Sequence, residues 1–142
     1  MPDFVPEKSK IFLLSPDECE EMSSFVRDQL WKGYIQPSSS PQMSPMFFVL
    51  KLETTAKRMC TDYWHLNKKT IKNNYPLLLI SEMIDKIGDA KVFMKLDLRW
   101  GFNNVWIKEG DKWKAAFICY EGAFEPLVMY FRPTNSLSTL QR

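Results

Sequence analysis

Residues 92–102 read Val-Phe-Met-Lys-Leu-Asp-Leu-Arg-Trp-Gly-Phe, and this stretch carries the first candidate for a functional site. From Val92 to Leu98 apolar side chains occupy every second position, a pattern typical of a β-strand. Asp97 is the one acidic residue of this strand. A carboxylate is costly to bury unless it is paired or binds a metal, and such strand-end carboxylates can hold magnesium beside a phosphate. Asp97 is therefore the first candidate site residue; the alternative is a solvent-facing aspartate at a strand edge.

Helices and strands are both expected elsewhere in the chain. Ser15-Pro16-Asp17-Glu18 predicts the start of a helix with a capping box, and Gly33 can end it. Three prolines in residues 37–45 predict an extended connector outside any sheet. The further expected elements are a strand at 46–52, its hairpin partner at 58–63 after a loop at 53–57, a polar loop around 67–74, a helix at 80–87 stopped by Gly88, strands near 115–120 and 123–129, and the opening turns of a helix in 133–142.

Composition excludes several classes of protein. The 142 residues are 45% hydrophobic and 25% charged, with a net charge of +2, as expected for one globular domain. Three widely spaced cysteines and a single histidine form neither a disulfide framework nor a zinc site. There is no apolar run of the ~20 residues that span a bilayer, and no secretory signal pattern. We expect an intracellular protein without membrane contact, in a compartment that the sequence does not indicate.

Basic side chains concentrate in residues 51–75. This segment carries six basic side chains against two acidic ones, whereas residues 34–50 carry no charge. A basic segment can follow a phosphate backbone, and a solvated lysine-rich surface is the alternative. The six are Lys51, Lys57, Arg58, Lys68, Lys69 and Lys72.

Several motifs resemble those of reverse transcriptases from gypsy-type LTR retrotransposons, in the same order and at nearly the same spacing. Residues 93–102 resemble the family's first catalytic motif, approximately Phe-x-Lys-Leu-Asp-Leu-Arg-x-Gly-Tyr. Residues 58–67, Arg-Met-Cys-Thr-Asp-Tyr-Trp-His-Leu-Asn, resemble its fingers motif, Arg-Met-Cys-x-Asp-Tyr-x-x-Leu-Asn. A pararetroviral polymerase is the alternative within the wider family. Shorter matches lie in residues 33–41, 74–91, 110–117 and 124–129.

The resemblance implies an α+β fold, the right-hand polymerase fold of reverse transcriptases, in incomplete form. The fingers and the leading part of the palm are expected within a single truncated domain, residues 1–142. The strand that carries Asp97 would pair, in the family, with a Tyr-x-Asp-Asp hairpin, so we expect its edge to be unpaired. The implied division is an N-terminal arm and helix at 1–33, fingers-like ranges at 34–75 and 104–130, and partial palm ranges at 76–103 and 131–142.

The implied activity is template-directed nucleotidyl transfer by an RNA-directed DNA polymerase of a transposable element, with two Mg²⁺ ions. Asp97 would be the first metal-binding and catalytic aspartate, and the Leu98 carbonyl would supply a second oxygen. The family's remaining carboxylates belong to the Tyr-x-Asp-Asp motif, which this sequence lacks. One aspartate cannot offset the dehydration of two ions. We therefore expect the fragment to be inactive alone and unable to hold both ions.

The nucleotide-binding residues also follow from the resemblance. Arg58 matches the fingers arginine over the base and triphosphate, and Lys51 is the nearest match to the fingers lysine. Phe102 occupies the steric-gate position that excludes the ribose 2′-hydroxyl. Phe131 matches a residue that packs beside the nucleotide. For both phenylalanines, plain core packing is the alternative.

One departure from the family's pattern lies at Arg132, where the family has a glycine that permits close approach to the nucleotide. Such changes favour the hypothesis of a copy that is no longer held to its chemistry. The implied partners are an RNA or DNA template-primer and deoxynucleotides. The alternative functions are a non-catalytic nucleic-acid-binding remnant, or a fragment that associates with an intact polymerase chain.

Overall fold

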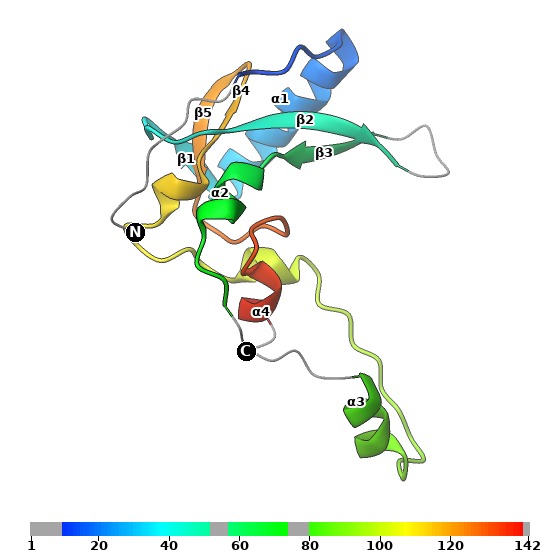
Figure 1. Ribbon diagram of the computed structural model, residues 1–142. Helices are drawn as coiled ribbons and strands as arrows, with labels where there is room; N and C mark the ends of the chain where they lie inside the picture. Colours follow the sequence, from blue (N-terminus) through cyan, green and yellow to red (C-terminus); the bar gives the residue numbers. More distant parts are fainter. Residues whose placement is uncertain (1–9, 52–56, 74–79, 141–142) are drawn as a thin grey trace.

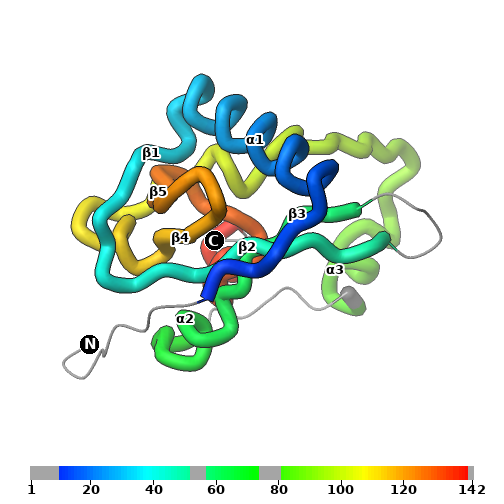
Figure 2. Tube along the Cα trace, turned by 90° about the horizontal axis from the view of Figure 1, so that it is seen from above, coloured from blue at the N-terminus to red at the C-terminus, as the bar shows by residue number. Residues whose placement is uncertain are grey.

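A five-stranded sheet with helix α1 packed on it forms the body of the protein (Figure 1). The computed structural model describes residues 10–51, 57–73 and 80–140. Seen from above, α1 lies alongside the strands (Figure 2), whereas α3 lies well away from the sheet (Figure 1). In the described part of the chain, no helix has the length and apolar character needed to cross a membrane.

Helix α1 (Pro16–Trp31) begins at the predicted capping box. The Ser15 amide donates to Glu18 Oε2 at 2.8 Å, and the Glu18 amide donates to Ser15 Oγ at 3.4 Å. These contacts satisfy amide groups that the first turn leaves without helical partners. Glu18 also pairs with Lys57 Nζ at 2.7 Å, and this hydrogen bond lowers the pKa of its carboxyl group. The helix ends two residues before Gly33, whose φ of +66° reverses the chain at low steric cost.

The sheet order is β1-β5-β4-β2-β3. β2 is antiparallel to β3, β4 is antiparallel to β5, and β2 runs parallel to β4 over a short register. Both predicted strand pairs are confirmed, with shorter bounds in the second pair. The loop predicted at 53–57 falls mainly outside the described residues. The strands are β1 (Ile35–Pro37), β2 (Ser44–Leu50), β3 (Lys57–Thr61), β4 (Phe117–Cys119) and β5 (Gly122–Pro126).

The main core lies between α1 and this sheet. Met22 and Val26 point from the helix, and strands β2, β4 and β5 contribute Met46, Phe117 and Phe124. Fully burying one such side chain is worth about 1.5–3 kcal/mol, so this cluster holds the helix on the sheet. On the same helix, the apolar Leu30 remains exposed, while the polar Gln29 is buried.

The prolines of residues 37–45 do not keep this segment out of the sheet, contrary to the sequence prediction. Pro37 ends β1, opposite Phe124 of β5, and Pro45 lies near the start of β2. β1 is an edge strand, and a proline at the end of an edge strand leaves few ladder hydrogen bonds to lose. Pro45 accepts a hydrogen bond through its carbonyl oxygen from the Asp62 amide at 2.9 Å.

The short helices were predicted unevenly. α2 (Trp64–Lys69) was not predicted: it follows the strand expected at 58–63 and overlaps the polar loop expected around 67–74. It buries Leu66 beside Tyr63 and Ala115. α3 (Ile80–Ile87) and α4 (Ser136–Leu140) confirm their predictions, and Gly88 directly follows α3. Two short 3₁₀ helices complete the description, η1 (Gly101–Asn104) and η2 (Lys112–Ala115).

The predicted strand at 92–98 is not formed, although its alternating pattern is clear. None of the described strands pairs with this segment, and all its side chains are exposed. Val92 and Met94 are 88% and 84% exposed. A strand needs a hydrogen-bonding partner as well as an alternating pattern. This segment runs extended, but none of the described strands lies beside it to pair with it (Figure 1).

This exposed apolar segment predicts self-association. We expect the average mass of the wild-type protein, measured by light scattering, to rise with concentration. A variant carrying Val92→Lys and Met94→Lys should stay monomeric over the same range. Ile71→Lys, at an exposed apolar residue outside the segment, serves as the control and should associate like the wild type. A reversible, cooperative melt of monomeric wild-type protein would contradict the prediction.

Candidate functional site

A cavity of about 1000 Å³ opens between α1, β3 and two segments that are distant in sequence, residues 96–103 and 130–132. Phe25 and Gln29 line it from α1, and Leu140 of α4 reaches it from the C-terminal side. Its volume lies at the upper end of the range of ~300–1,000 Å³ typical of ligand pockets. The cavity can therefore admit a nucleotide-sized molecule.

Five of the six candidate residues line this cavity, from β3 and from both distant segments. Lys51 does not line it; the residue is exposed and directly follows β2. The chemical roles of the six remain predictions. The five are Arg58, Asp97, Leu98, Phe102 and Phe131.

The two phenylalanines of the cavity contact each other. The ring centroids of Phe102 and Phe131 are 5.3 Å apart, and the rings are nearly perpendicular at 75°, a geometry that aromatic pairs prefer. Phe131 is 71% exposed and Phe102 is half-buried. Plain core packing therefore does not describe Phe131, and the pair presents an apolar surface to the cavity.

A strained turn returns the chain to the cavity after Leu98. Trp100 has a φ of +54°, in the left-handed region that bulky residues rarely adopt. Its carbonyl oxygen accepts from the Asn103 amide at 2.8 Å, and Lys32 Nζ lies 5.3 Å from the centroid of its ring. The turn lets Leu98 and Phe102 line the same cavity although four positions separate them.

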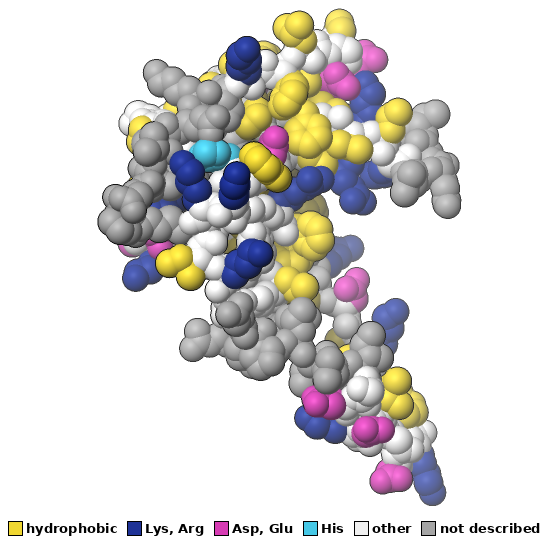
Figure 3. All heavy atoms as spheres, in the orientation of Figure 1, with side chains coloured by type: hydrophobic (Ala, Val, Ile, Leu, Met, Phe, Trp, Pro, Cys, Tyr) yellow, Lys and Arg dark blue, Asp and Glu magenta, His cyan; other side chains and the backbone are white. Residues whose placement is uncertain are grey.

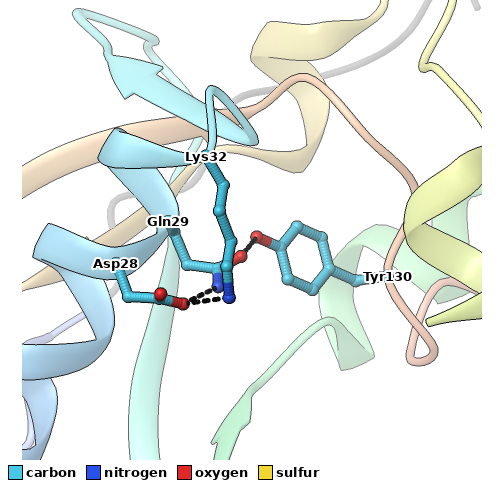
Figure 4. Close-up of polar contacts among 4 residues, drawn as sticks. All are labelled: Asp28, Gln29, Lys32 and Tyr130. Carbon is cyan, nitrogen blue, oxygen red and sulfur yellow. Dashed lines mark hydrogen bonds and ion pairs between the residues drawn. The ribbon is translucent and has the colours of Figure 1, made fainter. Parts of the chain in front are cut away.

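A polar chain from α1 positions the segment that carries Phe131 (Figure 4). Tyr130 OH donates to Gln29 Oε1 at 2.8 Å, and Gln29 Nε2 donates to Asp28 Oδ2 at 3.0 Å. Lys32 Nζ binds the same Asp28 oxygen at 2.6 Å, and this hydrogen bond lowers the pKa of Asp28. Burial raises the pKa of Tyr130, so its hydroxyl stays protonated as a donor.

Asn67 of α2 holds the next residues of that segment. Its Nδ2 donates to the Arg132 carbonyl oxygen at 3.2 Å, and its Oδ1 accepts from the Thr134 amide at 2.8 Å. Sequence reasoning did not single out Gln29 or Asn67 as site residues. Gln29 follows Val26 by three positions and Met22 by seven, so it lies on the same face of α1 as these buried residues. This spacing is the sequence feature that could have identified it.

Within the described part of the chain, the cavity offers few side-chain ligands for a metal ion. Asp97 is the one carboxylate among the residues that line the cavity. Across the described ranges, no three His, Cys, Asp or Glu side chains gather closely enough to hold a metal ion. A tight magnesium site needs more oxygen ligands than one side chain offers.

The half-buried Gln29–Tyr130 contact predicts a measurable cost when either partner changes. Gln29→Leu leaves the Tyr130 hydroxyl without its acceptor, and we expect a loss of about 1–3 kcal/mol in the free energy of unfolding. Tyr130→Phe should also destabilise, and the double variant should lose less than the sum of the two. Urea unfolding followed by circular dichroism measures all three.

Gln36→Leu is the matched control, because Gln36 donates to Glu125 at the exposed surface. It should change the stability by no more than about 0.5 kcal/mol. Strictly additive effects of Gln29→Leu and Tyr130→Phe would contradict the proposed contact.

The sequence of this chain resembles those of known proteins. The sequence pattern of the family "Reverse transcriptase (RNA-dependent DNA polymerase)" matches residues 49–139. The Transposon Tf2-3 and Tf2-4 polyproteins of Schizosaccharomyces pombe are each 39% identical over 116 residues, which is 82% of this chain. The chain spans 9% of the length of either polyprotein.

Solved structures agree on the fold. Prototype foamy virus protease-reverse transcriptase matches with a TM-score of 0.72 at 21% identity, over 97% of this chain and 18% of that one. The foamy viral enzyme in complex with an RNA/DNA hybrid matches with a TM-score of 0.77 at 17% identity, with the same coverages. These matches confirm the α+β fold as part of a reverse transcriptase.

The transposon relatives agree with the gypsy-type retrotransposon that the motifs indicated. The family pattern covers more than half of the sequence. The chain therefore belongs to the reverse transcriptase family.

Proposed function

We propose that this chain forms the nucleotide side of a retrotransposon polymerase active site, which binds a deoxynucleoside triphosphate for template-directed nucleotidyl transfer. The observation that carries the proposal is the meeting of five candidate residues in one cavity. Arg58 comes from the fingers-like range 34–75, whereas Asp97, Phe102 and Phe131 come from the palm-like ranges 76–103 and 131–142. The cavity thus lies where the proposed fingers and palm face each other.

Each candidate residue has a physical role in this proposal. The guanidinium group of Arg58 binds phosphate oxygens, since it is planar and always charged. The Phe102–Phe131 pair faces the sugar and leaves no room for a 2′-hydroxyl. Asp97 and the Leu98 carbonyl offer oxygen ligands for one of the family's two magnesium ions. Lys51 would approach the triphosphate from outside the cavity.

We also propose that the 142-residue chain alone does not extend a primer. Two-metal phosphoryl transfer needs both ions clamped by carboxylates, and the described cavity presents one, Asp97. The foamy viral relatives were solved with an RNA/DNA hybrid and with double-stranded DNA, which supports a template-primer as the partner here. Activity would then require carboxylates from further polypeptide, and association with an intact polymerase chain is one source.

Primer extension on an RNA template, with magnesium and deoxynucleotides, tests this proposal. We expect no extension by the wild type or by Asp97→Asn. Extension by the wild type that Asp97→Asn abolishes would refute the inactivity while keeping the assigned role of Asp97. Titration with a deoxynucleoside triphosphate should still show binding, weakened about tenfold or more by Arg58→Ala.

A second candidate function is non-catalytic nucleic-acid binding through the basic segment 51–75. Lys and Arg side chains gather on the face around α2 and β3 (Figure 3). On α2, Trp64 is 69% exposed and Lys68 Nζ lies 5.3 Å from the centroid of its ring. An exposed aromatic residue beside lysines suits stacking on unpaired bases next to a phosphate backbone.

The salt dependence of template-primer binding tests this second function. In fluorescence anisotropy between 50 and 200 mM salt, the double variant Lys68→Ala/Lys72→Ala should reduce the log–log slope by roughly 2. Lys57 is a poor probe, because Glu18 already binds it. Lys86→Ala on α3 is the control and should bind like the wild type. An unchanged slope in the double variant would refute a role for this segment.

A further inference from the structure

Arg132 lines the cavity where the family's pattern has a glycine. Its guanidinium Nη2 donates to Cys60 Sγ of β3 at 2.7 Å. The cavity volume of about 1000 Å³ remains with Arg132 in place. The side chain therefore forms part of the wall and does not fill the space.

The contact with Cys60 brings the two arginines of the cavity to one strand. Arg58 and Cys60 are two positions apart in β3, so their side chains leave the same face of the strand roughly 7 Å apart. The Arg132 guanidinium is bonded to Cys60 and so lies beside the root of the Arg58 side chain. Both cations line the same cavity.

The main chain of Arg132 is fixed as well. Asn67 binds its carbonyl oxygen, and the same amide group binds the Thr134 amide two residues later. Because these contacts use only main-chain atoms of this segment, they place the arginine without occupying its side-chain donors. A positioned guanidinium loses less conformational freedom when it binds an anion.

The charge of the cavity favours an anion. Its charged lining residues are Arg58, Arg132 and Asp97. Within the described ranges, neither arginine forms an ion pair with a carboxylate. Each guanidinium group can donate two parallel hydrogen bonds to a phosphate, so two of them in one cavity suit a ligand with several phosphates.

We propose that Arg132 is a second phosphate-binding residue, which forms with Arg58 a paired-guanidinium site for the phosphate chain of an oligophosphate. This inference rests on the proposed function and adds a residue to it. Recognition by the pair depends on the phosphate chain and not on the base. Inorganic triphosphate should therefore bind, and compete with deoxynucleoside triphosphates.

Isothermal titration of the full chain with inorganic triphosphate, at low salt and without magnesium, tests the pair. We expect Arg132→Ala and Arg58→Ala each to weaken binding about tenfold or more, the effect of losing hydrogen bonds to a charged group. Arg27→Ala is the matched control: it removes an exposed arginine of α1 outside the cavity, and it should bind like the wild type.

The outcomes separate the two proposals. Unchanged or tighter binding by Arg132→Ala, with weaker binding by Arg58→Ala, overturns the role of Arg132 and leaves the proposed function standing. If neither variant changes binding, or if the wild type binds neither triphosphate nor deoxynucleotide, both proposals fail.

If circular dichroism shows that Arg132→Ala does not fold, Arg132→Lys provides a second test. Lysine keeps the charge but lacks the planar pair of donors. Weaker binding of inorganic triphosphate by Arg132→Lys supports the paired site, and binding equal to that of the wild type overturns it.

Discussion

Helix α1 packs on the sheet, and its contacts position both walls of the cavity. Met22 and Val26 pack against buried residues of four strands, β1, β2, β4 and β5. Polar contacts near the two ends of the helix then fix the walls of the cavity. Near the N-terminus, Glu18 binds Lys57, the residue before Arg58. Near the C-terminus, Gln29 binds Tyr130, the residue before Phe131. One helix therefore sets the distance between cavity walls that are far apart in sequence.

Local signals predicted the elements that depend on local chemistry. The capping box and the glycine after α1 act within a few residues, so the sequence shows them directly. β1 has three residues and α2 has six, too few for a periodic pattern to be recognised. The segment 92–98 shows the opposite error. Its alternating pattern shows that one face of the segment is apolar and the other polar. Whether the segment pairs depends on another strand, and no pattern within the segment can show that.

The candidate site divides in a similar way. Motif spacing singled out Arg58, Asp97 and Phe102 as candidates, and all three line the cavity. Gln29 could not be found so directly, because its partner Tyr130 is 101 positions away. Asn67 contacts residues 65 and 67 positions away. Such supporting residues act through tertiary contacts. In the sequence they show only as polar residues on an otherwise buried helix face or inside a motif.

The strained turn at Trp100 shows how the supporting contacts and the cavity combine. A bulky residue in the left-handed region costs of order 1–3 kcal/mol, and Gly101, the next residue, could have taken that conformation more cheaply. Trp100 adopts it with its ring beside Lys32 and its carbonyl oxygen bonded to the Asn103 amide. Lys32 is in turn bound by Asp28, which also accepts from Gln29. The C-terminal end of α1 thus contacts both the Trp100 turn and Tyr130, so the two cavity walls that carry Leu98 and Phe131 share one support.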